Sequence, residues 1–341
     1  MDKRRILATL ALLGSFFAFG VIALGAFTRL VNAGLGCPDW PGCYGHLIVP
    51  MTDSAKQLAQ TYYPNLHLET YKAWAEMIHR YFVGGLSLFL LAVVVFIFVK
   101  KELRLRSNII LAISLVLLLL YQILLGRYTV TLKLLPIVVT LHLLGGFFIL
   151  SILWLIYLNN AYKPLWIEQK PSKLMIMGAS FALLILVLQI ALGAWTSTNY
   201  ASLSCTGFPF CMKDQNMVFQ FKEAFTLFAP IGINYEGGVL SESARQTIQM
   251  THRLGALIFT LYMIGFMAFA LPKLKQSFEI IKSFYVILGL LILQLSLGIA
   301  NVIFKLPLPN AISHNLVGVL LLLAVITLLF KLIMTKTKVS Q

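Results

Sequence analysis

The chain has 341 residues, of which 59% are hydrophobic and only 11% are charged, and its formal net charge is +15. A soluble domain cannot bury so much apolar surface, so the composition excludes a soluble protein and indicates an all-α integral membrane protein. The lysine and arginine residues lie between apolar runs instead of forming one patch. This distribution excludes a nucleic-acid-binding surface as the reason for the charge.

Eight apolar segments are long enough to cross a membrane as helices, which requires about 20 residues each. The predicted spans are Ile6–Phe27, Trp74–Val99, Ile109–Gly126, Leu134–Leu158, Leu174–Thr196, Ile248–Leu271, Phe284–Ile303 and Ala311–Phe330. The first span could be mistaken for a signal peptide. Its apolar stretch is too long for one and no convincing cleavage site follows, so we expect a retained helix.

Basic residues indicate which side of the membrane each connection occupies. They lie before the first span, in the second, fourth and sixth connections and in the tail, as Lys3, Arg4, Arg5, Lys100, Lys101, Arg104, Arg106, Lys163, Lys170, Lys173, Lys273, Lys275, Lys336 and Lys338. Short loops that carry lysine and arginine stay in the cytoplasm. We therefore expect cytoplasmic N- and C-termini, with the two long connections, residues 30–73 and 197–247, facing outward.

All four cysteines lie in these two outward connections. The stretch GLGCPDWPGCYG contains Cys37 and Cys43, and the degenerate copy SLSCTGFPFC contains Cys205 and Cys211. Disulfide bonds persist outside the cytoplasm, which makes Cys37–Cys43 and Cys205–Cys211 plausible pairs. Such pairs would staple each loop. A redox role and a metal site are the alternatives, and the sequence alone leaves the connectivity open.

The sequence repeats itself in its second half. EMIHRYFVGGL matches QMTHRLGALIF, YQILLGRYTV matches LQLSLGIANV, and TLHLLGG matches ISHNLVG, each 172 or 173 residues further along. Each repeat contains four spans, so both halves have the same orientation in the membrane. We expect two four-helix bundles, residues 1–160 and 174–341, related by a pseudo-twofold axis along the membrane normal and joined by a cytoplasmic linker, residues 161–173.

Four of the six histidines lie inside predicted spans near their outer ends, namely His79, His142, His252 and His314. An ionisable side chain in a membrane helix is costly and indicates a function. Two imidazoles from facing helices can bind haem iron from both sides. Small residues about a turn after the histidines would give a macrocycle room: Gly84, Gly85, Gly145, Gly255 and Gly318. The alternatives are structural histidines bonded to carbonyls, a di-metal site, which lacks carboxylates here, and a quinone site.

The two halves differ beside these histidines. Glu76 lies one helical turn before His79, whereas the aligned residue is Gln249. A carboxylate in one pocket could stabilise a cationic intermediate or move a proton, so we assign the reactive pocket to the first half and a bound electron-transfer haem to the second. A carboxylate that faces water at a helix start is the other interpretation. Arg80 and Arg253 are expected to pair with haem propionates, or alternatively to snorkel to the interface.

Six motifs together resemble the haem A synthase family: GAFTRLVNAGLGCPDWPGC, EMIHR, LLGRYTV, TLHLLGG, QMTHRLGA and ISHNLVG. The resemblance covers essentially all eight predicted spans. It implies an oxidoreductase that is a multi-pass protein of the bacterial cytoplasmic (inner) membrane. Such an enzyme oxidises the C8 methyl group of haem O to a formyl group, through hydroxylated intermediates, and so supplies haem A to cytochrome oxidase.

The resemblance also implies roles for residues of the first half. His79 and His142, together with Arg80, would bind the substrate haem O through its iron and propionates. Glu76 would be essential for the oxidation. As a hypothesis of our own, the cysteine loop of this half, with Trp40 and Pro41, would cover the porphyrin edge as a lid.

In the second half, the resemblance implies a haem b cofactor that passes electrons. Its iron would be ligated by His252 and His314, with Arg253 beside it. The pairs Cys37–Cys43 and Cys205–Cys211 would match the two loop disulfides of the family. Haem O synthase and an electron donor are candidate partners beside membrane lipid, and a homo-oligomer is left open.

Two other functions compete with this interpretation. A di-haem cytochrome that oxidises quinol would need the same histidines, but it gives no reason for Glu76 in one pocket and Gln249 in the other. A haem exporter would need a polar pathway through the membrane, and the inner halves of the predicted spans are almost wholly apolar. Haem A synthesis is therefore the function we expect.

Overall fold

The computed structural model describes residues 2–162, 166–167, 171–211, 218–274 and 277–337. Eight long helices dominate this part of the chain: α1 (Lys3–Leu30), α3 (Thr70–Val99), α4 (Arg106–Thr131), α5 (Pro136–Ala161), α6 (Lys173–Thr198), α8 (Glu242–Ala270), α9 (Phe278–Ile303) and α10 (Leu308–Met334). All eight are long and apolar enough to cross a membrane. The predicted eight-span helical membrane fold is confirmed.

The remaining elements are short. Helices α2 (Asp53–Tyr62) and α7 (Phe221–Ala224) lie in the two long connections, and η1 (Lys101–Leu103) and η2 (Leu271–Lys273) are single 3₁₀ turns. Strands β1 (Trp166–Ile167) and β2 (Lys336–Thr337) have two residues each and pair in parallel, with Trp166 opposite Lys336. Segments this short carry no detectable periodicity, which is why the sequence did not predict them.

Seven of the eight long helices begin before the predicted apolar spans, whereas α5 begins at Pro136, two residues after the predicted start at Leu134, because Leu134 lies in a left-handed turn. Helix α8 begins at Glu242, six residues before the predicted start at Ile248, because the Ser241 side chain accepts a hydrogen bond from the N–H of Ala244. Ser172 caps α6 in the same way through the N–H of Met175. Polar capping, and not hydropathy, therefore sets these helix starts.

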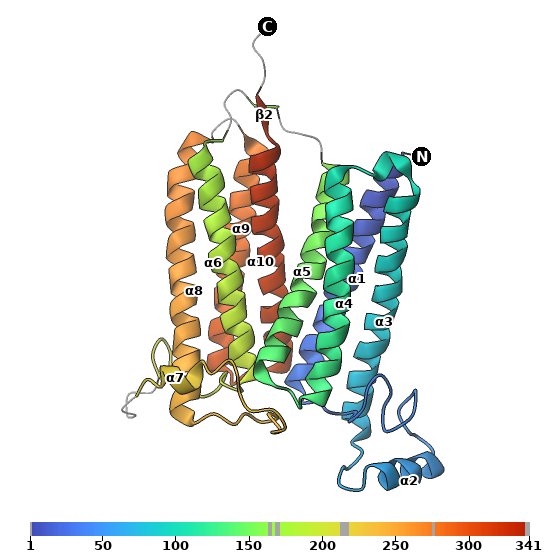
Figure 1. The fold of residues 1–341 in the computed structure, drawn as a ribbon. Helices are drawn as coiled ribbons and strands as arrows, with labels where there is room; N and C mark the ends of the chain where they lie inside the picture. Colours follow the sequence, from blue (N-terminus) through green and yellow to red (C-terminus); the bar gives the residue numbers. More distant parts are fainter. Residues whose placement is uncertain (1, 163–165, 168–170, 212–217, 275–276, 338–341) are drawn as a thin grey trace.

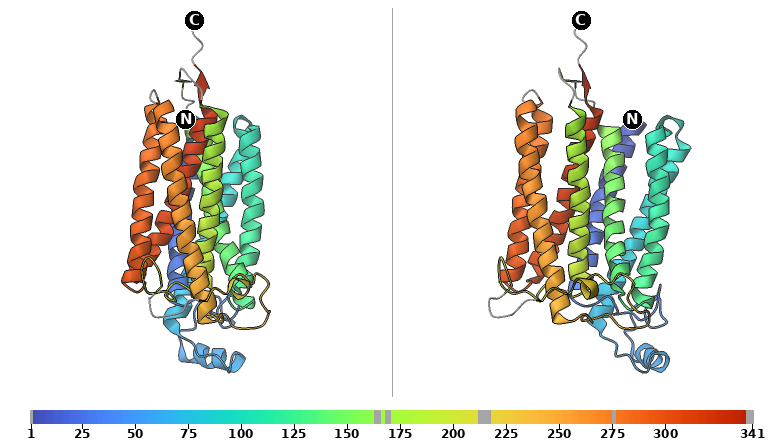
Figure 2. Two further views of the ribbon diagram at one scale, coloured as in Figure 1. Left: turned by 90° about the vertical axis from the view of Figure 1, so that its left-hand side faces the viewer. Right: turned by 60° about the vertical axis from the view of Figure 1, so that its left-hand side comes forward.

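The helices form two groups of four (Figure 1). Helices α1, α3, α4 and α5 pack together, as do α6, α8, α9 and α10, and the groups meet through α1, α5, α6 and α10. Both termini lie at one end of the bundles, while α2 and α7 lie at the other (Figures 1 and 2). We call these groups the first and second bundle, and the end that carries α2 and α7 the outer end.

Side-chain contacts join the bundles near their shared boundary. The indole N–H of Trp154 on α5 donates to the Thr327 hydroxyl of α10 at 2.8 Å. The Arg29 guanidinium at the end of α1 donates to the Ser197 carbonyl of α6 and lies 4.0 Å from the ring centre of Tyr200. Arg29 and Ser197 are positions that the sequence repeat aligns, and Thr327 is one residue from the position aligned with Trp154; residues near a twofold axis are expected to meet in this way. The axis itself stays a prediction.

Equivalent turns follow α4 and α9. Lys133 and Leu134 have φ angles of 48° and 61°, and Lys305 and Leu306 have φ angles of 54° and 62°. This left-handed conformation reverses the chain within a few residues. The same turn therefore sets how α4 approaches α5 and how α9 approaches α10, the two pairs that carry His142 and His314.

Candidate functional site

Each histidine of the membrane spans lies against a glycine of another helix. The pairs, with the distance that a Cβ atom added to the glycine would have from Cε1 of the ring, are Gly25–His79 (3.0 Å), Gly126–His142 (3.4 Å), Gly193–His252 (3.0 Å) and Gly298–His314 (3.1 Å). Most real Cβ contacts are longer, so a larger side chain would displace the rings. The glycines thus hold the four imidazoles in equivalent seats, two in each bundle.

The expected space after the histidines is used differently. A Cβ atom on Gly145 would lie 2.4 Å from Oε1 of Gln122, and one on Gly255 would lie 2.1 Å from Oε1 of Gln189. These two glycines therefore make room for glutamine side chains of neighbouring helices. Gly84 has open space beside it, with nothing within 4 Å of an added Cβ atom.

The donor set of each bundle fits haem iron. His79 and His142 interact electrostatically, as do His252 and His314, so the two rings of each pair share one region of their bundle. Within the described ranges, no cluster of three histidine, cysteine or acidic side chains could hold a bare metal ion. Haem iron needs only two axial ligands from the protein, because the porphyrin supplies the others.

Glutamine side chains contact three of the four histidines. Nε2 of Gln122 donates to the His142 carbonyl at 2.8 Å, and Nε2 of Gln294 lies 3.4 Å from Nε2 of His314. Nε2 of Gln189 donates to the His252 carbonyl at 2.9 Å and lies 3.1 Å from Nδ1 of the ring. The repeat had aligned Gln122 with Gln294. It had missed Gln189, although a glutamine inside an apolar span was a usable signal.

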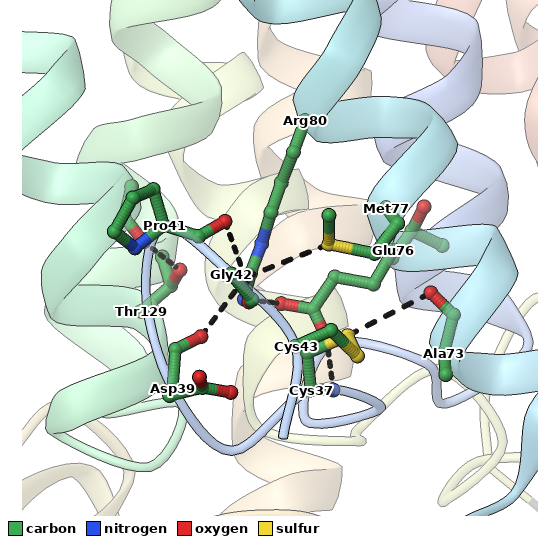
Figure 3. Close-up of polar contacts among 12 residues, drawn as sticks. Cys37, Asp39, Pro41, Gly42, Cys43, Ala73, Glu76, Met77, Arg80 and Thr129 are labelled. Carbon is green, nitrogen blue, oxygen red and sulfur yellow. Dashed lines mark hydrogen bonds and ion pairs between the residues drawn. A yellow bond between two sulfur atoms is a disulfide. The ribbon is translucent and has the colours of Figure 1, made fainter. Parts of the chain in front are cut away.

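Glu76 is buried and points toward the first cysteine loop (Figure 3). Its side chain is 5% exposed, and Oε2 accepts a hydrogen bond from the Cys37 backbone N–H at 2.9 Å. Its other oxygen forms an ion pair with Arg80, one helical turn further along α3. The alternative of a water-facing carboxylate is therefore wrong: α3 begins at Thr70, and the loop covers Glu76.

Arg80 connects Glu76 to the same loop. Besides the ion pair, its guanidinium donates to the carbonyls of Asp39 at 2.9 Å, Pro41 at 3.3 Å and Gly42 (Figure 3). Hydrogen bonds from a charged donor are stronger than neutral ones, so the loop is pinned over the outer end of α3. The expected pairing of Arg80 with propionates stays a prediction.

Arg253 holds the second cysteine loop in nearly the same way. It donates to the carbonyls of Cys205 at 2.7 Å, Gly207 at 2.6 Å and Pro209 at 2.9 Å. The residue at the Glu76 position, Gln249, is also 5% exposed, and its Nε2 donates to the Ser202 carbonyl at 3.3 Å. The two bundles therefore share the arginine contacts and differ in the carboxylate. For Arg253 too, the propionate role is still a prediction.

Both predicted disulfides are present. Cys37 is bonded to Cys43, with Cα atoms 4.7 Å apart, and Cys205 to Cys211, with Cα atoms 4.8 Å apart. The first loop is further held by Asp39, whose carboxylate accepts from the N–H groups of Tyr44 at 2.6 Å and Gly45 at 2.8 Å. A closed, internally bonded loop presents the Cys37 N–H to Glu76.

Comparison with known proteins gives one consistent result. Residues 8–326 match the model of the cytochrome oxidase assembly protein family, COX15-CtaA. A "Heme A synthase" of Shewanella oneidensis is 43% identical over 314 residues, which cover 92% of each chain. Proteins of the same name from Bacillus pumilus, 25% identical with 91% of this chain and 89% of that one covered, and Rickettsia akari, 27% identical with 90% and 92% covered, are similar as well.

The match extends over the whole site. It includes both cysteine loops, both arginines and all four glycine-seated histidines, which lie between residues 25 and 314. The relatives are bacterial, and eight apolar helices cross the membrane, so this is a multi-pass protein of the inner membrane. The chain belongs to the COX15-CtaA family of cytochrome oxidase assembly proteins.

Proposed function

We propose that this protein is a haem A synthase, an oxidoreductase that oxidises the C8 methyl group of haem O to a formyl group, through hydroxylated intermediates, for use in cytochrome oxidase. Relatives with that name over nine tenths of the chain support the activity. The buried carboxylate that only one bundle has, Glu76 against Gln249, is the observation that separates a reactive pocket from a supporting one.

In this proposal the first bundle, residues 1–160, binds the substrate haem O. His79 and His142 would bind its iron, because their rings lie in one region and are seated on glycines. The apolar interior of the bundle would suit a hydrophobic porphyrin and would exclude water from the methyl group. Arg80 would serve the propionates from the outer rim, in addition to its contacts with the loop.

Glu76 would carry the proton chemistry. Oxidation of a methyl group removes protons as well as electrons. A carboxylate beside the porphyrin edge can accept the protons. The Cys37 N–H and Arg80 fix both oxygens of this carboxylate, so it has one orientation under the cysteine loop. In the second bundle Gln249 cannot accept a proton, which fits a site without chemistry.

The second bundle, residues 174–341, would hold haem b as a resident cofactor. His252 and His314 fit its iron as axial ligands, with Arg253 at the same rim. When bound, haem b supplies one-electron redox chemistry. The chain contributes the ligand geometry, through Gly193 and Gly298, and an apolar setting. We further propose cytoplasmic termini and the linker at residues 161–173, with an unidentified electron donor and haem O synthase as partners.

A quinol-oxidising di-haem cytochrome is not favoured, since the relatives are synthases by name and Glu76 would have no use in it. The test is to extract haems from cells that produce haem O and express either the wild-type chain or Glu76→Gln. We expect haem A from the wild type alone, with unchanged protein levels. A wild type that converts no haem O would overturn the proposed function.

A further inference from the structure

The outer turns of the two bundles are covered differently. A segment of the second half, residues 225–240, which we call the strap, reaches across to the turn between α4 and α5 of the first bundle. Tyr235 of the strap is 2% exposed and packs in a buried apolar cluster with Leu125, Leu134, Leu135 and Val138. A ring buried so fully against another bundle makes a specific contact.

Hydrogen bonds hold the strap in this position. The N–H of Tyr235 donates to the Lys133 carbonyl at 3.0 Å, and Nζ of Lys133 donates to the Gly232 carbonyl at 3.3 Å. The Tyr235 hydroxyl donates to the Pro230 carbonyl at 2.6 Å, which fixes the ring within the strap. The strap is thus bonded to the turn through its backbone as well as its side chain.

The cluster lies directly outside the seat of His142. Leu125 precedes Gly126, the glycine that contacts the His142 ring, and Val138 lies one turn before His142 on α5. Tyr235 therefore braces both helices that hold this imidazole. Any movement of α4 relative to α5 would disturb its contacts.

The second bundle braces the equivalent helices internally. Asn310, at the position of Val138, donates to the Leu297 carbonyl at 2.9 Å and to Oδ1 of Asn301 at 2.8 Å. These bonds tie α10 to α9 beside His314. In the turn itself, Phe304 is 67% exposed. The second bundle therefore has a side-chain tie at its outer turn, and the first bundle, which has Val138 at the position of Asn310, has the strap contact there instead.

We propose that Tyr235 is a positioning residue for His142 and that the strap is a removable brace, which lets the first bundle exchange its porphyrin while the second retains its own. The inference rests on the proposed function for which bundle binds the substrate. Glycines with positive φ flank Tyr235, Gly232 at +97° and Gly237 at +81°, and an added Cβ atom on either would meet nothing within 4 Å. Such residues can act as hinges without a steric barrier.

The test measures haem release from each bundle. Full-length protein in lipid nanodiscs, with haem b bound and haem O added, is mixed with excess apomyoglobin, and transfer of each haem is followed by absorption. Tyr235→Ala should speed haem O transfer about tenfold and leave haem b transfer unchanged, since coupling between contacting elements is commonly of that order. Asn310→Ala is the matched control: it should speed haem b transfer and leave haem O transfer unchanged.

Two further measurements keep the test decisive if Tyr235→Ala folds poorly. Tyr235→Phe keeps the ring and loses only the bond to Pro230, so haem O transfer should rise about threefold. Amide hydrogen exchange should rise in residues 132–139 of this variant and not in residues 304–311. Unchanged transfer and exchange in both variants, in a protein that still makes haem A, would overturn the strap proposal alone. A wild type that makes no haem A would instead overturn the function.

Discussion

The two bundles have the same frame and different polar residues. Both seat two histidines on glycines, and both pin a disulfide-closed loop with the arginine that directly follows the first histidine of the pair, Arg80 or Arg253. They differ at Glu76 against Gln249 and at Val21 against Gln189. The two bundles therefore share the seating of their histidines and differ in the polar groups beside them.

The largest effect should follow the removal of the buried carboxylate one turn before His79. Glu76→Gln is expected to lower haem A formation about 1000-fold, because general acid–base catalysis contributes about 10² to 10⁴. The measurement is the ratio of haem A to haem O in extracts. Gln249→Glu is the matched control and should leave the ratio within a few-fold of the wild type. Equal losses in both variants would show that the oxidation is not confined to the first bundle.

The second-largest effect should be a loss of stability when Arg80 is replaced. Arg80→Gln leaves Glu76 buried without its ion-pair partner, whose side chain is only 13% exposed, and we expect a loss of about 3 kcal/mol in the free energy of unfolding. Arg253→Gln strands no carboxylate and should cost about 1 kcal/mol. Denaturant unfolding in detergent measures both values.

The double variant Glu76→Gln, Arg80→Gln separates the charge from the loop contacts. It should recover most of the difference between the two arginine variants, because no buried charge is left unpaired. If it stays as unstable as Arg80→Gln alone, the loop carbonyls and not Glu76 determine the cost.

A smaller effect is expected from opening the loops. The serine double variant of Cys37 and Cys43 should lower haem A yield about tenfold, because a flexible loop no longer presents the Cys37 N–H to Glu76 and misplacement by about 1 Å is costly to a reaction. The serine double variant of Cys205 and Cys211 should change yield less than threefold. Similar losses from both would mean that the disulfides matter only for folding.

The sequence was sufficient to predict the membrane spans and their grouping. Apolar runs gave eight spans, and matched histidines gave the two-bundle division, because membrane helices need about 20 apolar residues and rarely contain ionisable groups. The position of the cysteines in two outward loops made the disulfide pairs plausible, and the structure supplied the connectivity. These features depend on local composition, which one sequence displays directly.

The sequence was insufficient where residues distant along the chain meet. Nothing in the sequence showed that Gly25 and Gly193 would contact the rings, since the expected glycines lay after the histidines on their own helices. The contact of Tyr235 with Leu134 joins residues about a hundred positions apart, in a loop with no periodic pattern. Tertiary packing decides such contacts.

The smallest predicted effect tests the seats themselves. Gly25→Ala should weaken haem O binding about threefold, since a methyl group 3.0 Å from Cε1 of His79 forces a small displacement of the ring. Gly20→Ala on the same helix meets nothing within 4 Å and should leave binding unchanged. Gly193→Ala should shift the haem b spectrum and spare haem O affinity. Titration of haem O into purified protein gives the haem O affinity of all three variants. The absorption spectrum of the Gly193→Ala protein gives the haem b shift. Weakening by Gly20→Ala equal to that by Gly25→Ala would place the effect in helix packing and remove the role of the glycine seat.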